Sequence, residues 1–535
     1  MNQIVYGDAA GTTSVFSYDT RRRLSSVQTY RGPPAIWSQQ PPAYSPASNP
    51  AGPPDTFQLL LQDLQYQYDS VDDPITIRDF RSPAEWPAGA QPMTRTIQYD
   101  DLYRVTNVAY AYPGGVDPWV DPFYAEDNGL DADPRRAQPS PHVSFVQRVM
   151  SQSFQYDWLG NTSSSDDDAH GFYDRSLGTI TNGTSANGPY QLHSAAGAAA
   201  SLRNGALSAT YDAAGNLVSL SVTRSGPCLP TSSSCSQQYA YAWDEVGHLA
   251  SAKRWDGAAA TGRANAELDY AYDANDRRTL KTAVGAGSEG ADAQTLYVFP
   301  SLDLRRTTWT GSDYAQYDAS NDPLEVGYLI AHGVRLARLH YAIDSVPTAA
   351  SGQLHVLLEL PDHLSSTSIV LDKGTGEVVE AASYLPYGAG ESTYRPRRWA
   401  SFREDYGFTG KEEDVELGIE YFGKRYLAPA LGRWMSADPA SVHSISADPN
   451  LYAYVSGRPL KAIDPVGLDD ATYFEHAALG FGLDATPGAP RRAASRTWPF
   501  TPSRRACHWS HGSTTRFRPT TFTPSPSRVP VIPGS

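Results

Sequence analysis

The chain has 535 residues, a formal net charge of −15 and only 19% charged residues. The negative charge argues against a nucleic-acid-binding body, because phosphates would be repelled. Three cysteines are too few for a disulfide scaffold, and no run of 18 apolar residues is present that would span a membrane. The 33 tyrosines, 43 glycines and 41 prolines favour strands and turns over helices.

The first 20 residues, MNQIVYGDAAGTTSVFSYDT, contain neither a basic segment nor an apolar core. They therefore predict that no signal peptide is present. We expect either a cytosolic chain or one that is cytoplasmic before export and leaves by a dedicated system without an N-terminal signal peptide.

One signature recurs along the first half of the chain. A short alternating run ends in an aromatic residue followed by Asp, and a polar or glycine-containing turn then leads to Leu or Val, as in SATYDAAGNLVSLSV. Successive aromatic residues are 29 to 57 residues apart, which fits a unit near 30 residues with insertions. The seven aromatic residues are Tyr18, Tyr68, Tyr99, Tyr156, Tyr211, Trp243 and Tyr272.

Each of these units predicts a β-hairpin. Leu268, Tyr270 and Tyr272 alternate with polar or small residues, which is the period-two pattern of a strand with one apolar face. The carboxylate of the next residue, Asp273, can accept backbone N–H bonds from the turn, and several units supply a Gly for a turn residue with positive φ. A hairpin cannot bury its apolar face alone, so the hairpins must stack into a continuous sheet.

Three stretches interrupt the repeats and are predicted to be surface loops. Residues 32–54 hold eight prolines, and residues 114–142 and 163–208 are rich in small and polar residues. The acidic run SSSDDDAHG in the third stretch lacks a spaced ligand pattern, so a solvated loop is favoured over a Ca²⁺ site. Cys228 and Cys235 bracket the run CLPTSSSC, and either a disulfide closes this loop or both residues remain thiols.

The second half of the chain carries longer motifs. The run LPDHLSSTSIVLDKGTGEVVEAASYLPYGA (360–389) resembles a segment of RHS/YD-repeat proteins. YGFTGKEEDVELGIEYFGKRYLAPALGRWMSADP (406–439) resembles the start of the RHS repeat-associated core domain, and NLYAYVSGRPLKAIDPVGL (450–468) resembles its end. The resemblance is weak in the repeats and specific over residues 360–468.

This resemblance implies an all-β fold: a strip of YD-repeat hairpins that spirals into a hollow shell and is closed by a C-terminal RHS core plug. The implied domains are a repeat region at 1–359, the core domain at 360–468 and a variable tail at 469–535. In this family the tail is a toxin or effector that is held inside the shell, released by self-cleavage and delivered by a secretion or toxin-complex machine. Because family shells use more repeats than 468 residues supply, a partner subunit is expected to complete the shell.

One motif stands where cleavage is implied. Eight Asp-Pro pairs occur in the chain, and only the pair at Asp464 continues as DPxG. It lies at a break in composition, because eight arginines against four acids give residues 469–535 a formal charge of +4 and leave −19 on residues 1–468. The scissile bond implied by the family is Leu468–Asp469.

Hydrolysis by carboxylates requires two acids that share a proton, so that one activates water and the other protonates the carbonyl or the leaving amine. By resemblance the partner of Asp464 is Asp438, and Arg433 is predicted to orient one carboxylate. The first motif reads DPAS rather than the family's DPxG, which leaves its backbone geometry open. Asp448 is the alternative partner, and a further alternative is that all three acids only cap turns.

The tail gives no sign of a folded enzyme. Residues 485–535 are rich in Arg, Pro, Ser and Thr, a composition typical of disorder, and the tail is interpreted as a basic effector, a degenerate remnant or a frame-shifted end. Cys507, His508 and His511 do not make up the four ligands of a zinc site, so we predict no metal and no cofactor. No phosphate loop, G-x-S-x-G or H-E-x-x-H motif of a multiple-turnover enzyme is present.

Two functions remain after these observations. The first is a toxin carrier that encloses its own tail, with a partner shell subunit or a delivery machine. The second is a cell-surface structural protein or adhesin of the YD-repeat type, without enzymatic activity, whose aromatic residues stack on carbohydrate.

Overall fold

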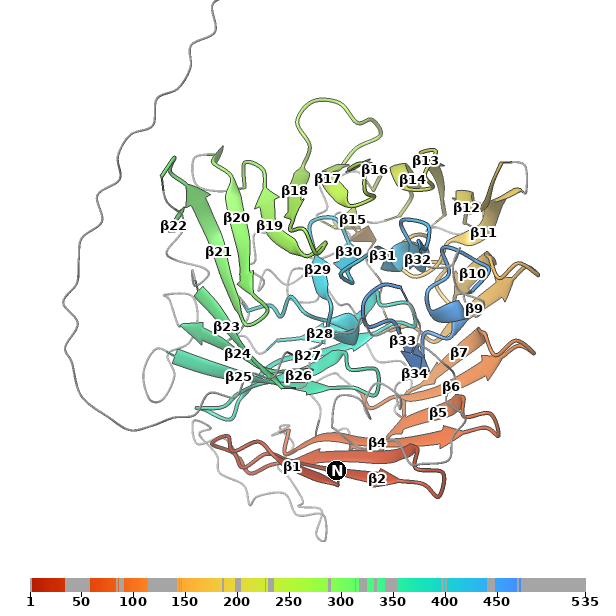
Figure 1. Cartoon of the computed structure of the whole chain (residues 1–535). Helices are drawn as coiled ribbons and strands as arrows, with labels where there is room; N and C mark the ends of the chain where they lie inside the picture. The colour runs from red at the N-terminus through yellow and green to blue at the C-terminus, as the bar shows by residue number, and fades with distance from the viewer. Residues whose placement is uncertain are drawn as a thin grey trace, which may run out of the picture. The chain divides into compact units, whose positions relative to one another are not determined.

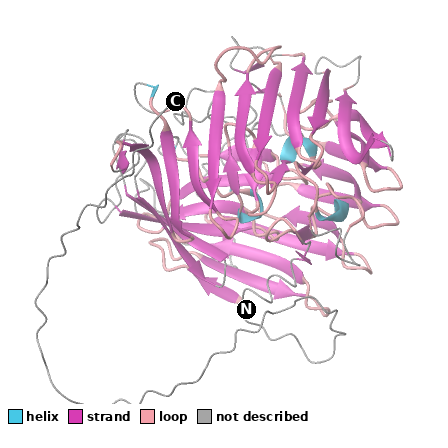
Figure 2. Ribbon diagram, turned by 45° about the horizontal axis from the view of Figure 1, so that its top comes forward, coloured by secondary structure: helices cyan, strands magenta, loops and turns pink. Residues whose placement is uncertain are grey.

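Antiparallel β-structure dominates the computed structural model, and no α-helix occurs in the part of the chain that it describes (Figure 2). Three short 3-10 helices, Phe408–Gly410, Pro429–Leu431 and Val455–Gly457, lie in the C-terminal part. The described residues are 2–33, 58–82, 85, 91–113, 142–143, 145, 147–184, 187–197, 204–226, 228–229, 235–286, 290–312, 314–316, 325–331, 334–341, 354–395, 399, 402–439, 448–468 and 471–472.

Twenty-six strands form one sheet. They are β1 (Gln3–Val5), β2 (Thr13–Tyr18), β3 (Leu24–Tyr30), β4 (Leu60–Tyr68), β5 (Pro74–Asp79), β6 (Thr94–Tyr99), β7 (Val105–Ala111), β9 (Ser151–Tyr156), β10 (Thr162–Asp167), β11 (Gly178–Thr184), β12 (Asn187–Ala196), β13 (Gly205–Tyr211), β14 (Leu217–Arg224), β16 (Gln237–Trp243), β17 (Leu249–Trp255), β18 (Ala266–Tyr272), β19 (Arg278–Ala283), β20 (Ala293–Phe299), β21 (Leu302–Trp309), β22 (Tyr314–Gln316), β23 (Glu325–Ala331), β24 (Val334–Tyr341), β25 (Leu354–Pro361), β26 (Thr367–Asp372), β27 (Val378–Tyr384) and β28 (Gly390–Tyr394).

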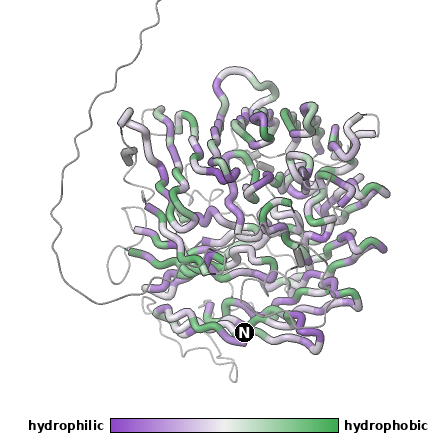
Figure 3. The backbone as a smooth tube through the Cα atoms, viewed as in Figure 1, coloured by the Kyte–Doolittle hydropathy of each residue, from purple (hydrophilic) through white to green (hydrophobic). Residues whose placement is uncertain are grey.

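The strands of this sheet follow one another in space as they do in sequence. Each pairs antiparallel with the next strand of the sheet, apart from β21, which pairs with both β22 and β23. The sheet continues without interruption past residue 359 to β28, and among the described strands its two edges, β1 and β28, do not pair with each other. Hydrophobic and hydrophilic residues alternate along many of its strands (Figure 3). The predicted all-β strip is confirmed.

Smaller sheets stand beside the strip. β8 (His142–Val143) pairs with β15 (Cys228–Leu229), so the end of the stretch 114–142 meets the start of the run CLPTSSSC. The segment after β28 forms a four-stranded sheet of β29 (Glu412–Asp414), β30 (Ile419–Tyr421), β31 (Tyr426–Ala428) and β32 (Arg433–Trp434), and then the hairpin of β33 (Ala462–Ile463) and β34 (Ala471–Thr472). Residues 1–484 group into one compact unit.

All seven predicted YD hairpins are present, namely β2–β3, β4–β5, β6–β7, β9–β10, β13–β14, β16–β17 and β18–β19. Their turns share one geometry, which the turn after Trp243 illustrates. One carboxylate oxygen of Asp244 accepts the backbone N–H groups of Val246 and His248, at 3.0 and 2.8 Å. The turn therefore satisfies its own donors without the sheet.

The aromatic residue of the motif joins one hairpin to the previous one. The Tyr99 hydroxyl donates to the carbonyl oxygen of Pro74 at 2.8 Å, and the Trp243 indole N–H donates to that of Leu217 at 2.7 Å. Tyr68, Tyr156 and Tyr272 repeat this contact, and in all five cases the acceptor is the first residue of the returning strand one hairpin earlier. A ring with a polar tip is thus what the position requires, which explains why Trp replaces Tyr in one repeat.

One predicted loop is wrong. Residues 163–208 contain most of β10, the whole of β11 and β12 and the start of β13, all within the sheet. The composition misled because a few apolar residues suffice for the core: Ile180, Leu192 and Leu207 are buried and belong to one hydrophobic cluster. The acidic run at its start folds as strand and turn, where Asp167 accepts the N–H of Gly171 at 2.6 Å.

Other expectations fall mostly outside the described residues: the loops at 32–54 and 114–142 apart from their first or last residues, and the tail 469–535 apart from β34. Cys235 is disulfide-bonded, which favours the closed loop over two thiols, whereas the side chain of Cys228 lies outside the described residues. No helix of the described part is long and apolar enough to cross a membrane.

The core segment, residues 402–468, packs against two separate parts of the strip, which curves around it in Figure 1. One hydrophobic cluster combines Val108 and Phe154 of the early hairpins with Phe422, Trp434 and Ile463 of the core segment. A second cluster combines later hairpins, from β11 to β18, with residues of β30 and β31. Burial against both the early hairpins and those from β11 to β18 fixes where the core segment sits.

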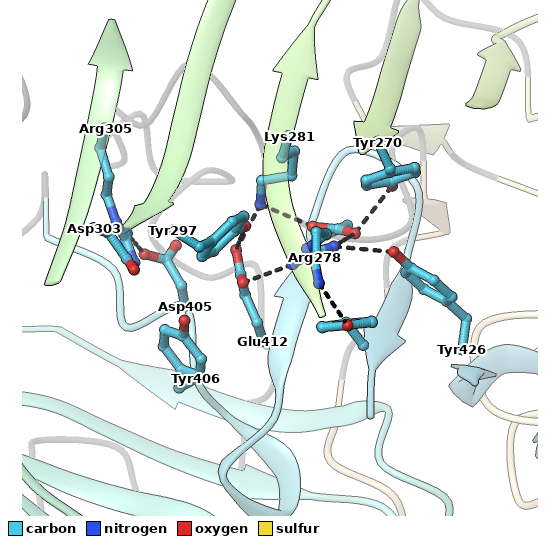
Figure 4. Close-up of polar contacts among 12 residues, drawn as sticks. Tyr270, Arg278, Lys281, Tyr297, Asp303, Arg305, Asp405, Tyr406, Glu412 and Tyr426 are labelled. Carbon is cyan, nitrogen blue, oxygen red and sulfur yellow. Dashed lines mark hydrogen bonds and ion pairs between the residues drawn. The ribbon is translucent and has the colours of Figure 1, made fainter. Parts of the chain in front are cut away.

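A buried ionic network also ties the core segment to the strip (Figure 4). Arg278 of β19 contacts Glu412 at 2.6 Å and Asp414 at 2.8 Å, and both carboxylates belong to β29. Lys281 contacts the same two acids at 2.7 and 2.8 Å. The Arg278 side chain is 1% exposed, so these charges depend on one another for solvation.

Candidate functional site

The DPVGL loop, residues 464–468, is a turn that closes on the carboxylate of its first residue. Oδ1 of Asp464 accepts the backbone N–H groups of Val466, Gly467 and Leu468, at 3.1, 2.6 and 3.1 Å. Gly467 has φ +84°, and a Cβ atom there would lie 3.0 Å from the backbone nitrogen of Arg425. Glycine is required both for the positive φ and for this close approach.

Three donors outside the loop hold its carbonyl oxygens. The ammonium group of Lys411 donates to Pro465 at 2.5 Å, and the backbone N–H of Lys424 donates to Val466 at 3.0 Å. The guanidinium of Arg425 donates to the carbonyl oxygen of Gly467. The loop is therefore held on both its N–H and its C=O groups.

Arg425, in the turn between β30 and β31, joins the two predicted acids. One of its terminal nitrogens lies 3.1 Å from Oδ2 of Asp438 and 3.5 Å from Oδ2 of Asp464. Its guanidinium also stacks over the ring of Trp434, with the carbon 4.2 Å from the ring centroid. The side chains of Asp464 and Arg425 are 3% and 4% exposed and that of Asp438 is 15% exposed, so the three groups form a nearly dry cluster.

Burial changes the acid–base properties of this cluster. Desolvation raises the pKa of Asp464, while Arg425 and the three backbone N–H groups lower it less. Desolvation also lowers the pKa of Lys411 to about 8, against the opposing charges of Asp464 and Glu420. A carboxyl group whose pKa is raised is suited to carry a proton that it can donate.

The structure brings Asp438 and Asp464 together but not the other predicted residues. Arg433 donates to the carbonyl oxygen of Tyr190 at 3.0 Å, whereas the arginine that contacts both Asp438 and Asp464 is Arg425. Asp448 accepts the N–H of Asn450 at 2.7 Å and caps a turn.

The predicted scissile bond lies in the loop that joins β33 and β34. Ala462 pairs with Thr472 and Ile463 pairs with Ala471, so the strands on both sides of the bond are held together. Leu468 is half-buried, and Asp469 lies outside the described residues.

Sequence reasoning missed Arg425 and Lys411. Neither stands next to an Asp-Pro pair, and Arg425 is not a neighbour of Asp438 in the sequence. Their only signal was membership of the segment 406–439, whose motif is specific. Among the described residues no group of three or more His, Cys, Asp or Glu side chains is arranged to hold a metal ion.

Comparisons with known proteins find similarity to toxin subunits, although no protein-family model matches this chain. It is 24% identical over 469 residues to toxin subunit YenC1 of Yersinia entomophaga, covering 86% of this chain and 40% of that protein. It is 27% identical to toxin subunit YenC2 of the same organism, covering 76% of this chain and 37% of that protein. The chain thus spans well under half the length of these curated relatives.

A shorter match is 41% identical over 219 residues to toxin protein Tse5 of Pseudomonas aeruginosa, covering 38% of this chain and 15% of that protein. Among solved structures, TcdB2-TccC3-TEV matches with a TM-score of 0.55 at 19% identity, covering 87% of this chain and 19% of that one. The Photorhabdus luminescens Tc holotoxin pore matches with a TM-score of 0.56 at 20% identity, covering 86% and 18%.

The hairpin strip around a core segment agrees with the resemblance to RHS/YD-repeat proteins that the motifs at 360–389, 406–439 and 450–468 carry. The chain is similar to the YenC subunits of toxins and shares its fold with the Tc toxin structures.

Proposed function

We propose that this chain is part of a toxin-carrier shell that encloses its variable C-terminal tail and releases it by cutting its own backbone between Leu468 and Asp469. One observation carries the proposal: a single nitrogen of Arg425 contacts Asp438 and Asp464, and Asp464 holds the loop that leads to the bond. The similarity to toxin subunits supports the carrier over the adhesin alternative.

In the proposed reaction, water attacks the carbonyl carbon of Leu468. One carboxylate of the Asp438–Asp464 pair takes a proton from the water, while the other, protonated beforehand, donates a proton to the carbonyl oxygen or the leaving nitrogen. The C–N bond breaks, leaving a carboxyl group on Leu468 and an amino group on Asp469. The raised pKa of Asp464 suits the proton donor, and Arg425 stabilises the negative charge that remains.

Intact mass spectrometry of the freshly purified full chain tests this proposal. Wild type is expected as two polypeptides, the second beginning at Asp469. Asp438→Asn and Asp464→Asn are each expected as one uncut chain, because the remaining carboxylate cannot act as both acid and base. A folded wild type that stays uncut would leave the three acids as turn caps.

The proposal extends to partners and location. The sheet has two unpaired described edges, so a partner shell subunit is proposed to complete the enclosure, with a delivery machine to carry the tail outside the cell from a cytoplasmic precursor. The basic tail, rich in arginine, suits an acidic enclosure. Small-angle scattering of the chain alone and with its genomic neighbour tests this, since an extended rod in both samples would favour the adhesin.

A further inference from the structure

Lys411 is a lysine of the core segment whose ammonium group meets a main-chain oxygen instead of a carboxylate. Its Nζ donates to the carbonyl oxygen of Pro465 at 2.5 Å, and the ring of Phe422 lies 5.2 Å away. No ion pair joins Lys411 to an acid among the described residues. The ammonium group of this partly buried lysine is directed at one backbone carbonyl of the candidate cleavage loop, and the contact calls for a reason.

The polar groups of the loop supply that reason. Its three N–H groups go to Asp464, and its carbonyl oxygens at Pro465, Val466 and Gly467 each receive a donor. Within the described part of the chain, no donor contacts the carbonyl oxygen of Leu468, the group that hydrolysis must attack. Donors from outside the loop thus hold three consecutive carbonyl oxygens before Leu468, and Lys411 holds the first of them.

We propose that Lys411 is a positioning residue for the self-cleavage: its charged ammonium group holds the Pro465 carbonyl and thereby keeps the Leu468–Asp469 bond beside Asp438 and Asp464. This inference rests on the proposed self-cleavage. Lys411 contacts Pro465, three residues before Leu468, so it is proposed to act through the loop, as a preorganising contact does in other active sites.

The contact depends on charge, because an ammonium donor bonds a carbonyl more strongly than a neutral amine does. The charged groups that face Lys411 are Asp464 beyond β33, Glu420 of β30 and Arg335 of β24. Burial raises the pKa of Glu420 well above its usual value, so that acid neutralises Lys411 poorly at neutral pH. Since burial lowers the pKa of Lys411 to about 8, the clamp loses its charge as the pH rises through that value.

The test is a pulse–chase of full-length chain made by cell-free synthesis, with the chase at pH values from 6 to 10 and the new N-terminus at Asp469 followed over time. Lys411→Met should cut at least tenfold more slowly at pH 7, and the alkaline fall in rate near pH 8 should disappear. Lys411→Arg keeps a charged donor and should restore most of the rate, with the alkaline fall moved beyond pH 10.

Lys424→Met is the matched control. The Lys424 side chain binds Asp276 of a repeat turn at 2.7 Å, whereas the loop is held by its backbone N–H, which the substitution keeps. Its rate and pH profile should stay within twofold of wild type. Equal rates and equal pH profiles for Lys411→Met and wild type would overturn the positioning role while leaving the self-cleavage intact.

A second measurement does not depend on cleavage. In the Asp438→Asn chain, adding Lys411→Met should speed hydrogen exchange of the Val466, Gly467 and Leu468 amides at least tenfold, because the loop is no longer held at Pro465. Unchanged exchange would refute the clamp. A wild type that is never cut would remove the self-cleavage proposal first, and the positioning role would fall with it.

Discussion

The loop at Asp244 and the loop at Asp464 share the pattern Asp-x-Val-Gly and nearly the same backbone. In both, one carboxylate oxygen accepts N–H groups two and four residues later, and the glycine has φ +88° or +84°. Their surroundings are opposite: the Asp244 side chain is 31% exposed at a repeat turn, whereas that of Asp464 is 3% exposed in the core segment. The candidate cleavage loop therefore resembles a turn of the repeats, but its Asp side chain is buried instead of partly exposed.

The change of setting reverses the acidity of the two residues. At Asp244, mild desolvation is outweighed by the hydrogen bonds from His248 and Val246, so the pKa is lowered. At Asp464, desolvation outweighs Arg425 and the backbone donors, so the pKa is raised. A turn that only organises backbone thus becomes a candidate proton donor through burial, although its carboxylate gains a third amide donor, that of Gly467.

The largest difference between the two settings should come from removing an arginine. Arg425→Met takes away the cation shared by Asp438 and Asp464 and should slow cleavage at least a hundredfold, because two acids are left without a counter-charge. Arg23→Met removes the arginine that pairs with Asp19 and Asp72 at a repeat turn and should leave cleavage within twofold. Mass spectrometry measures the cleavage rate of both variants. A similar loss of rate in both would contradict a special role for Arg425.

A second pair of substitutions compares stability. Arg278→Met leaves Glu412 and Asp414 buried with only Lys281, at a cost of about 3–5 kcal/mol. Arg21→Met removes an ion pair with Asp72 whose side chains are 53% and 46% exposed, at a cost of about 0–1 kcal/mol. Urea denaturation in the Asp438→Asn background gives both values. Equal shifts in the midpoint would show that the core segment is not held by this network.

The two glycines give a smaller contrast. Alanine at Gly247 meets open space and should cost only the positive φ, about 1 kcal/mol. Alanine at Gly467 also approaches the Arg425 nitrogen to 3.0 Å, which should add about 1–3 kcal/mol and slow cleavage by displacing the loop. Urea denaturation and the cleavage rate are measured together. A Gly467→Ala chain as stable and as fast as Gly247→Ala would argue that the loop is loose.

The smallest expected effect is that Asp464 and Asp244 change the stability of the fold with pH in opposite directions. The folded-state pKa of Asp464 is above its unfolded value, so its contribution to stability falls as the pH rises from about 4. The folded-state pKa of Asp244 is below its unfolded value, so its contribution is lost as the pH falls below about 4. Asp464→Asn and Asp244→Asn are each made in the Asp438→Asn chain. The difference in free energy of unfolding between each double variant and the Asp438→Asn chain should change in opposite directions between pH 3 and 6.

Much of the strip could be predicted from sequence because its rules are local. The aromatic–Asp pair sets the strand end, the turn and the link to the previous hairpin, all within a few residues. The strands in 163–208 could not be predicted in the same way. The segment has few apolar residues, such as Leu192, and their place in the core is evident only when the neighbouring strands are known.

The site shows the same division. The DPVGL motif identifies Asp464 as a candidate, and a second Asp-Pro pair identifies Asp438 as its candidate partner. Arg425 carries no local pattern, since its role follows from a guanidinium that reaches both acids only after β30 and β31 have folded. Arg433 lies closer to Asp438 in the sequence and was predicted for that reason, but in the folded chain it contacts Tyr190.

In the proposed self-cleavage, the β33–β34 hairpin would make hydrolysis of the backbone and release of the tail two separate events. If the Leu468–Asp469 bond is hydrolysed, the strands on both sides still pair, so the new carboxyl and amino ends face each other at a high effective concentration. Rejoining then competes with separation, and the nick becomes permanent only when something draws the tail away. If the proposed cleavage occurs, the β33–β34 pairing would therefore make release of the tail, rather than hydrolysis, the step that cannot be reversed.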